Sequence, residues 1–377
     1  MKNRTRRIFL QRSMFGLLAS SLGLIRCSNA QAVQVQTVAG NGIAGYEPDG
    51  GDGLIATETM VNNPYGIIAG SDGQLYFCEV DTGRTRKLDL VSRRLTTVAG
   101  NGEKAYAGDG RQALQASFSA PHEIRFDNSG NLYIVERDAH VVRRIDARTN
   151  MVSTVAGSGE AGYGGDGGPA SAALLRQPHS IAFDADGNLL ICDIGNSRVR
   201  RVEMETGIIN TLSGTGERET TPDIAPLQGT PLLGPRSLDT DPAGNAYLVL
   251  REGNAVFKLD IRANRLERIA GTGERGYSGD GGAALAATFN GPKGIAYSAL
   301  DQSLYIVDTE NHVIRRMQLA TGTIETVLGS GERGDGPDGN PLTCKLNRPH
   351  GVYVYDGIVY VTDSESHRIR AISGLIG

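Results

Sequence analysis

The chain of 377 residues has no tryptophan, only four cysteines and 6% aromatic residues. Three of the cysteines, Cys78, Cys192 and Cys344, lie beyond Ala32, and three thiols cannot form a complete disulfide framework. The apolar stretch at residues 13–25 is too short to span a bilayer comfortably. These absences exclude a disulfide-stapled domain and predict no stable membrane insertion.

Glycine and proline are frequent without dominating the composition. The 51 glycines and 14 prolines make up about 17% of the chain, below the roughly 25–30% typical of low-complexity sequences. With 39% hydrophobic residues, a chain of this length can bury a core without disulfides or structural metals. We therefore expect a folded protein.

The segment from Met1 to Ala32 contains six basic residues and no acidic ones. The apolar stretch follows the basic start, and AQA at residues 30–32 is a small-x-small pattern that signal peptidases accept. TRRIFLQ at residues 5–11 resembles the twin-arginine export motif, although an ordinary secretory signal or an uncleaved anchor is the alternative. We expect residues 1–32 to be a twin-arginine signal peptide, residues 33–377 to be the mature domain, and the protein to be periplasmic or secreted in a bacterium.

The mature chain is acidic. Without the six basic residues of the leader, the total of 38 Lys and Arg falls to 32 against 42 Asp and Glu, which gives a net charge of −10. Such a surface repels the phosphate backbone of nucleic acids. We therefore expect no nucleic-acid partner.

A strictly spaced repeat organises the mature chain. Proline-led motifs, PYGI, PHEI, PHSI, PRSL, PKGI and PHGV, begin at residues 64, 121, 178, 235, 292 and 349, and the interval between them is constant. In the third unit, β-rich runs at 179–183, 189–192, 199–203 and 208–212 are separated by turn residues such as Asp186-Gly187. Units of four antiparallel strands repeated around an axis form a β-propeller.

The two ends of the mature chain complement each other. The last unit has three strand-like runs, at 351–355, 358–362 and 368–373, and the sequence TVAG at residues 37–40 matches the end of the fourth strand in other units. We predict an all-β fold, a six-bladed β-propeller of four-stranded antiparallel blades, which the N-terminal strand closes by joining the last blade.

At these residues the sequence resembles a known family. PHSI at 178–181 and DIGNSRVR at 193–200 resemble the NHL repeat, and the glycine-rich connections resemble those of teneurin-type and bacterial exported NHL propellers. The resemblance covers the whole mature chain and implies the propeller fold. It leaves the function open, because NHL propellers include both binding scaffolds and enzymes.

Acidic residues recur at two positions of the repeat. One aspartate per unit, which we expect to cap a turn, is found at residues 49, 109, 166, 223, 280 and 338. A second series ends the second strand of five units and consists of Glu79, Glu136, Asp193, Asp308 and Asp363, with Leu250 in the remaining unit. Because arginines follow on the third strands, we interpret this second series as structural ion pairs, worth no more than about 1 kcal/mol each if exposed.

The residues that directly follow the six prolines carry the chemistry. They are Tyr65, His122, His179, Arg236, Lys293 and His350. Because the first strand of a propeller blade lies nearest the axis, we expect these side chains to form a ring, the axial ring, at one mouth of the channel. Half of the six histidines of the chain fall at these positions, which chance does not explain. The structural alternative is that each imidazole only binds neighbouring backbone.

The axial ring places two cations on adjacent blades. Arg236 and Lys293, at roughly 7 Å and an effective dielectric of about 20, repel each other by on the order of 2 kcal/mol. Nearby acids or an anionic ligand must offset this repulsion. Acids would make the position structural, whereas an anion would make it functional.

The axial ring resembles that of peptidyl-hydroxyglycine amidating lyase, another six-bladed NHL propeller, in which three Pro-His motifs bind zinc. The resemblance implies that His122, His179 and His350 hold one divalent metal ion, zinc above all. It implies Tyr65 as a catalytic acid or base, and Arg236 as a catalytic residue that binds a substrate carboxylate with Lys293. The histidines here come from blades 2, 3 and 6, whereas those of the lyase come from alternate blades.

Two functions therefore stay open. The first is an exported propeller whose axial ring makes it a metal-dependent lyase or hydrolase acting on a small anionic substrate. The second is a non-catalytic NHL propeller that binds a ligand, a peptide or a partner protein in the cell envelope. The expected partner is thus a small anionic molecule, a peptide or an envelope protein, and we expect a monomer.

Overall fold

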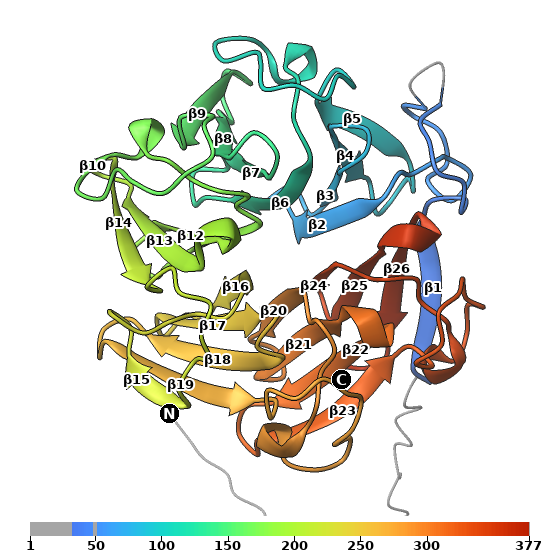
Figure 1. Cartoon of the computed structure of the whole chain (residues 1–377). Helices are drawn as coiled ribbons and strands as arrows, with labels where there is room; N and C mark the ends of the chain where they lie inside the picture. Colours follow the sequence, from blue (N-terminus) through green and yellow to red (C-terminus); the bar gives the residue numbers. More distant parts are fainter. Residues whose placement is uncertain (1–31, 48–50, 377) are drawn as a thin grey trace, which may run out of the picture. The chain divides into compact units, whose positions relative to one another are not determined.

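The structure is a computed structural model that describes residues 32–47 and 51–376. The leader predicted at residues 1–32 falls outside the described residues except for Ala32, and Asp49 is outside them too. The described chain forms six antiparallel sheets placed around a central axis (Figure 1). The predicted all-β, six-bladed propeller is confirmed.

Each blade consists of consecutive antiparallel strands, the first of which lies at the axis (Figure 1). Blades 1 to 3 contain β2 (Pro64–Ala69), β3 (Leu75–Glu79), β4 (Arg84–Leu88) and β5 (Leu95–Ala99); β6 (Pro121–Phe126), β7 (Leu132–Glu136), β8 (Val141–Ile145) and β9 (Val152–Ala156); and β11 (Ser180–Phe183), β12 (Leu189–Asp193), β13 (Arg198–Glu203) and β14 (Ile208–Ser213). Blades 4 to 6 contain β16 (Pro235–Thr240), β17 (Asn245–Leu250), β18 (Ala255–Asp260) and β19 (Arg265–Ala270); β20 (Gly294–Ser298), β21 (Ser303–Asp308), β22 (Val313–Gln318) and β23 (Thr323–Leu328); and β24 (Gly351–Tyr355), β25 (Ile358–Asp363), β26 (Arg368–Ser373) and β1 (Gln34–Ala39).

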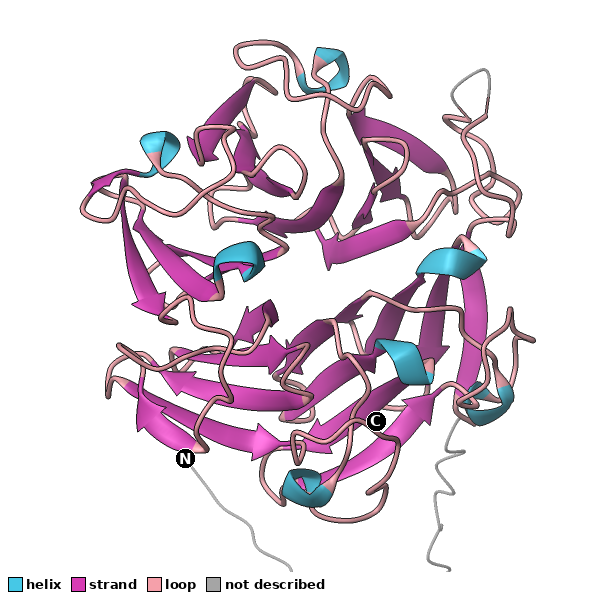
Figure 2. Ribbon diagram, in the orientation of Figure 1, coloured by secondary structure: helices cyan, strands magenta, loops and turns pink. Residues whose placement is uncertain are grey.

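Two short strands and seven short helices complete the described part of the chain (Figure 2). The strands β10 (Gly168–Pro169) and β15 (Ile224–Pro226) add a fifth strand to blades 3 and 4, which the repeat does not predict. The 3-10 helices are η1 (Ala113–Gln115), η2 (Ala170–Ala172), η3 (Ile194–Asn196), η4 (Ala284–Ala286), η5 (Thr309–Asn311), η6 (Pro341–Thr343) and η7 (Ser364–Ser366). Across residues 32–47 and 51–376, no helix has the length and apolar character needed to cross a membrane.

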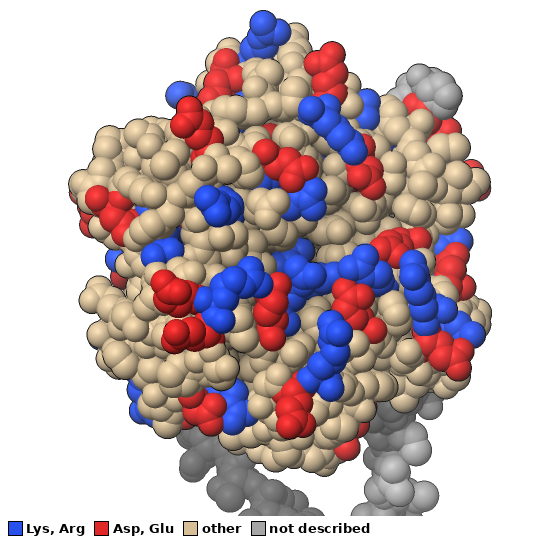
Figure 3. All heavy atoms as spheres, viewed as in Figure 1, with Lys and Arg blue, Asp and Glu red and all other residues tan. Residues whose placement is uncertain are grey.

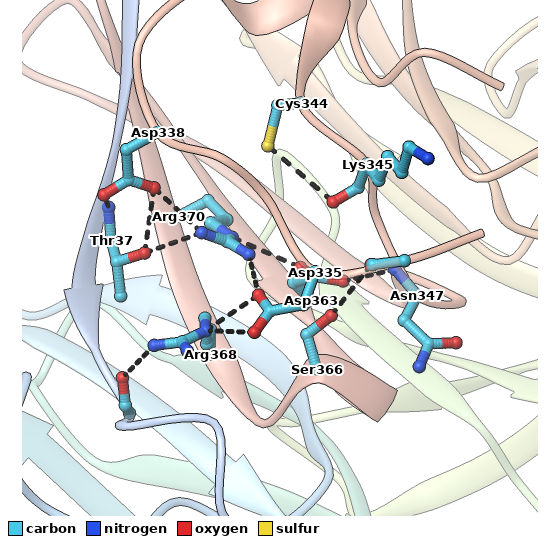
Figure 4. A network of polar contacts seen from close by, with 12 residues as sticks. Thr37, Asp335, Asp338, Cys344, Lys345, Asn347, Asp363, Ser366, Arg368 and Arg370 are labelled. Carbon is cyan, nitrogen blue, oxygen red and sulfur yellow. Dashed lines mark hydrogen bonds and ion pairs between the residues drawn. The ribbon is translucent and has the colours of Figure 1, made fainter. Parts of the chain in front are cut away.

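Strand β1 pairs with β26 and is the outermost strand of blade 6. Side chains reinforce this pairing, as Figure 4 shows. Arg370 on β26 donates to Thr37 Oγ1 at 2.6 Å and to Asp338 Oδ1 at 2.8 Å, and Asp338 Oδ2 accepts the Thr37 N–H at 2.8 Å. One arginine therefore ties the N-terminal strand to the C-terminal blade.

In five of the six blades, an acid at the end of the second strand forms a buried ion pair with an arginine on the third strand. The pairs are Glu79–Arg86, Glu136–Arg143, Asp193–Arg200, Asp308–Arg315 and Asp363–Arg370, with nitrogen–oxygen distances of 3.0–3.9 Å. The predicted structural pairs are thus present, but each arginine side chain is at most 2% exposed, so the limit of about 1 kcal/mol for exposed pairs does not apply to them. Each arginine also contacts an aspartate of the glycine loop, and in blade 1 this aspartate is Asp52.

Blade 4 replaces this ion pair with two apolar side chains. Leu250 stands at the position of the acid and Phe257 at the position of the arginine, and both lie in the core between blades 3 and 4. The aspartate of its glycine loop, Asp223, instead binds Arg268 on β19 through two contacts of 2.7 Å. The same two positions are therefore filled by an ion pair in five blades and by an apolar pair in blade 4.

Neighbouring blades are joined by side chains that accept a backbone N–H across the junction. His140 accepts from Gln177 at 3.1 Å, His312 from Arg348 at 3.2 Å and His367 from Asn63 at 3.2 Å, each through Nδ1. At the junction of blades 4 and 5, the Asn254 amide oxygen accepts from Gly291 at 2.9 Å. The three histidines outside the axial ring are therefore structural.

These junctions predict that acid weakens the propeller. Burial lowers the pKa of His140, His312 and His367, and each imidazole accepts its hydrogen bond only when it is neutral. These hydrogen bonds contribute their full stabilisation above about pH 6.5, the pKa of histidine in the unfolded chain. That stabilisation, about 1 kcal/mol per bond, is lost as the pH falls through the lowered pKa of the folded protein. Urea unfolding between pH 8 and pH 5 measures this loss.

The matched control is the triple variant His140→Asn, His312→Asn, His367→Asn. It places at each junction the amide that Asn254 already uses. We expect this variant to lose the histidine part of the pH dependence and to keep the remainder. Identical slopes of stability against pH in the two proteins would contradict the junction role.

Candidate functional site

The loops that present the axial ring share one backbone conformation. The residue before each ring proline has a positive φ, between 48° and 75°, and these residues are Asn63, Ala120, Gln177, Gly234, Gly291 and Arg348. Acids at the ends of the second strands hold several of these loops; Asp363, for example, accepts the Asn347 N–H at 2.7 Å. A strained backbone fixed in this way orients the following side chain.

The structure brings the ring side chains together at one mouth of the channel. The ring centroids of His179 and His122 lie 4.6 Å apart, and those of His122 and Tyr65 also lie 4.6 Å apart. Tyr65 stacks on His350 at 3.9 Å, and His350 Nε2 is 3.5 Å from Lys293 Nζ. Five of the six predicted residues thus form a continuous chain of contacts. The sixth, Arg236, interacts electrostatically with Tyr65 in this chain.

Close approach of blades 5, 6 and 1 depends on glycine. A Cβ on Gly294 would lie 2.3 Å from the His350 carbonyl oxygen, and a Cβ on Gly351 would lie 2.2 Å from that of Tyr65. Blades 3 and 4 carry Ser180 and Ser237 at the same position. The glycines therefore allow the tight stack of Lys293, His350 and Tyr65.

The three imidazoles of the axial ring are neutral acceptors. Nδ1 of His122 and of His179 contacts the carbonyl oxygens of Ala120 and Gln177, at 3.2 Å and 2.7 Å. Because a carbonyl oxygen only accepts, the hydrogen-bond network assigns the proton to Nδ1 and leaves Nε2 as an acceptor. Burial, and then the nearby charges of Arg236 or Lys293, lower the pKa of His122, His179 and His350 well below the usual value.

Lys293 is a cation whose charge is partly offset. Its Nζ lies 2.8 Å from Glu310 Oε1, and the side chain is 5% exposed. Burial lowers the pKa of Lys293 to about 8, although Glu310 opposes this shift. Glu310 also binds Arg348, at 2.8 Å, so one carboxylate serves two cations.

Arg236 is a cation without an ion-pair contact in the described chain, although the charge of Glu123 acts on it. The residue is 6% exposed, and among the described residues its side chain makes no hydrogen bond or ion pair. Burial lowers the pKa of Arg236 to about 10, so the guanidinium stays charged at neutral pH. Its charge also lowers the pKa of Lys293, as the proximity of the two cations predicts. Most buried charges are paired, which makes this residue unusual.

Tyr65 is a neutral phenol. Burial raises the pKa of Tyr65, and the positive charge of Arg236 offsets part of this effect. A phenol with a raised pKa donates a hydrogen bond more readily than it accepts a proton. A catalytic role for Tyr65 stays a prediction, and a neutral phenol at this position can serve as a hydrogen-bond donor.

The donor chemistry of the histidines suits a metal ion, but their arrangement does not. Free Nε2 atoms, with Nδ1 held by oxygen, are typical of metal ligands. However, the Tyr65 ring packs against both His122 and His350, and Lys293 occupies the Nε2 side of His350. Across the described ranges, no group of three His, Cys, Asp or Glu residues is placed to hold a metal ion. We derive no step through a metal, and the zinc assignment stays a prediction.

Basic side chains surround this mouth. Figure 3 shows Lys and Arg gathered near the centre of the face that η3, η5 and η7 border, with acidic side chains beside them. Arg251 and Arg275 line a cavity of about 570 Å³ that also contacts Glu310, the partner of Lys293. The charge of Arg251 also acts on Arg236, so this cavity adjoins the axial ring.

Two of the repeats match a family model. The family model for the NHL repeat matches residues 175–202 and 346–372, which contain the first three strands of blades 3 and 6. The match covers two of the six blades, and curated NHL-repeat and teneurin proteins align with most of the chain. The chain is a six-bladed NHL-repeat propeller.

Curated relatives of this NHL propeller are longer proteins. It is 26% identical over 269 residues to Protein SUPPRESSOR OF QUENCHING 1, chloroplastic, of Arabidopsis thaliana, covering 68% of this chain and 25% of that protein. It is 24% identical over 324 residues to NHL repeat-containing protein 2 of Gallus gallus, covering 78% and 44%. It is 30% identical over 283 residues to Teneurin-3 of Mus musculus, covering 65% and 10%. The chain thus spans less than half the length of these relatives.

Solved structures share the fold of this NHL propeller. An auxiliary nutrient binding protein from Bacteroides thetaiotaomicron has a TM-score of 0.65 at 16% identity, covering 90% of this chain and 76% of that chain. Virginiamycin B lyase from Staphylococcus aureus has a TM-score of 0.51 at 13% identity, covering 90% and 99%. At these identities the likeness shows the fold alone.

Proposed function

We propose that the axial ring of this NHL propeller binds a small anionic molecule, whose carboxylate or phosphate group lies on Arg236. The observation that carries the proposal is the buried guanidinium of Arg236, which forms no ion pair with any described acid and interacts with Glu123 only through its charge. An uncompensated buried charge is costly, and an anion in the channel mouth offsets that cost.

The surrounding groups suit the same ligand. Lys293 adds a second positive charge, and Tyr65 adds a phenol donor on which the charge of Arg236 acts. Glu310 and Glu365 balance only part of the charge of Lys293, Arg348 and Arg333, so the local balance stays positive. The fold neighbours include a nutrient-binding protein, which agrees with a ligand-binding propeller.

Titration calorimetry with phosphate and with short mono- and dicarboxylates tests this function. We expect saturable binding in low-salt buffer that weakens as sodium chloride is added, because screening reduces the attraction between charges. Choline at the same concentrations serves as the cationic control and is expected not to bind at the axial ring. The absence of saturable binding by every anion would overturn the proposal.

Lys293 predicts how this binding depends on pH. Its pKa is about 8, so the side chain is a cation below this pH and neutral above it. We therefore expect anion affinity to fall roughly tenfold as the pH rises from 7 to 9, in line with the loss of one nearby charge. Lys293→Met is expected to bind more weakly at pH 7 and to show no inflection near pH 8. An unchanged inflection in this variant would remove Lys293 from the site.

A lyase or hydrolase is the second candidate, and one contact favours it. The Lys293 amine and the neutral His350 imidazole lie 3.5 Å apart, beside the proposed anion position. A neutral imidazole accepts a proton from a substrate that Arg236 holds by its carboxylate. Retained anion binding with lost turnover in His350→Gln supports catalysis, whereas an unchanged turnover contradicts a proton-transfer role.

Zinc and export remain separate proposals. A metal ion on His122, His179 and His350 is tested by elemental analysis of protein purified from the cytoplasm. Location in the periplasm or outside the cell rests on the leader pattern of residues 1–32. Fractionation of cells that carry the twin-arginine pair or its Lys-Lys replacement tests that location.

A further inference from the structure

The opposite mouth of the channel contains a second cavity. Its volume is about 1130 Å³, and it is lined by the residues that end the first strands and by the turns that follow them. The axial ring begins these same strands, so the two sites lie at opposite ends of the channel. We call this second site the aromatic mouth, after Phe126, Phe183, Tyr297 and Tyr355, which line it and are half-buried.

The lining of the aromatic mouth is acidic. It includes Asp127, Asp184, Asp241 and Asp356, and it includes no Lys, Arg or His. Arg201 binds Asp184 at 2.8 Å, but in the described chain no ion pair neutralises the other three. Burial raises the pKa of Asp241, but hydrogen bonds from Asn245 and Tyr247 outweigh it and lower that pKa. Its carboxylate is therefore charged at neutral pH and has no cation beside it.

A buried hydroxyl group adds a third, independent observation. Ser298 lines the aromatic mouth and is 2% exposed, yet its Oγ has no hydrogen-bond partner among the described residues. An unpaired buried hydroxyl costs about 1–3 kcal/mol. A ligand in the cavity is a source of the missing partner.

Charged residues also lie between the two mouths. Arg125, in the middle of β6, binds Glu123 at 2.6 Å, and the charge of Asp239 also acts on it. The positive charge of the axial ring and the negative charge of the aromatic mouth thus lie on either side of this charged layer.

We propose that the aromatic mouth binds an organic cation with an apolar body, a quaternary or protonated amine that bears an aromatic or branched group. Aromatic walls favour such a cation through their π faces, and uncompensated carboxylates favour it through charge. The cavity, at about 1130 Å³, is slightly larger than the roughly 300–1000 Å³ of most small-molecule sites in proteins. This site is distinct from the anion site of the axial ring and does not rest on it.

A single tryptophan reports on this site. The natural chain has none, and Leu300 lines the cavity and is 64% exposed. The Leu300→Trp variant therefore places the only indole of the protein at the aromatic mouth. We expect benzyltrimethylammonium to change its fluorescence saturably, and neopentylbenzene, the neutral carbon isostere, to bind at least tenfold more weakly.

Two variants in the same background locate the effect. Asp356→Asn removes an exposed charge at a residue with a φ of 49°, a conformation that asparagine tolerates, and we expect a threefold to tenfold loss of affinity. Arg236→Met alters the axial ring and is expected to leave the titration unchanged. Calorimetry on the natural chain repeats the titration without the reporter.

Three results would overturn the proposal. They are no saturable binding of benzyltrimethylammonium in fluorescence and calorimetry, equal binding of the neutral isostere, and loss of binding in Arg236→Met. Failure of anion binding at the axial ring leaves these outcomes untouched, so the two proposals fail separately.

Discussion

Replacing Arg200 with methionine is expected to lower the free energy of unfolding by about 3–5 kcal/mol, because it leaves the Asp193 carboxylate buried without its cation. Both side chains are completely buried, with a nitrogen–oxygen distance of 3.7 Å. Asp193 also accepts the Arg176 N–H at 2.7 Å, which holds it in place beside the ring loop. Urea and thermal unfolding of Arg200→Met measure the loss.

Blade 4 supplies the matched control for this prediction. The double variant Asp193→Leu, Arg200→Phe copies Leu250 and Phe257, which pack in the core at the same two positions. We expect the double variant to recover at least half of the stability lost in Arg200→Met, since an apolar pair leaves no buried charge. Equal destabilisation of the single and double variants would show that the ion pair itself, and not the orphaned acid, determines stability.

Replacing Arg236 with methionine is expected to have two opposite effects. In a buffer without binding anions the variant should be more stable than the natural protein by about 1–3 kcal/mol, because a buried charge without a partner is removed. In a buffer with an anion at about 100 times its dissociation constant, the natural protein should gain about 2.7 kcal/mol, and the variant should gain nothing. Thermal unfolding with and without phosphate measures both effects.

Arg268→Met is the control for Arg236→Met. Arg268 lies at the outer edge of blade 4 and is already bound twice by Asp223. Its loss should lower stability slightly and leave the response to anions unchanged. If Arg236→Met is destabilised in anion-free buffer, then Arg236 is a structural residue and the proposed anion site is wrong.

The fold could be predicted from the sequence because the repeat has a constant period. The constant interval between the six proline-led motifs places equivalent side chains at equivalent points of each blade, so the ring positions follow from the sequence once the propeller is recognised. The run at 179–183 shows the limit of this reasoning, because β11 begins at Ser180 instead of His179. The extra strands β10 and β15 were missed because they contain only two and three residues and lie in the glycine-rich connections, just after the recurring Asp166 and Asp223.

The partners of the ring were harder to predict from the sequence. The repeat indicates that Arg236 and Lys293 are neighbours, but not that Glu310 binds Lys293 and leaves Arg236 unpaired. For the strand-end acids, the ion pairs were predicted but their burial was not. A series of acids followed by arginines is compatible with exposed or buried pairs. Burial of those arginines follows from three-dimensional packing between blades, which residue spacing alone does not contain.

The most direct test of the account is a crystal structure of the protein soaked with selenate, whose anomalous signal identifies the anion. We expect a selenate ion in the channel mouth, within hydrogen-bond distance of the Arg236 guanidinium and near Lys293. Selenate bound only elsewhere, or an acidic side chain paired with Arg236 in its place, would contradict the central claim.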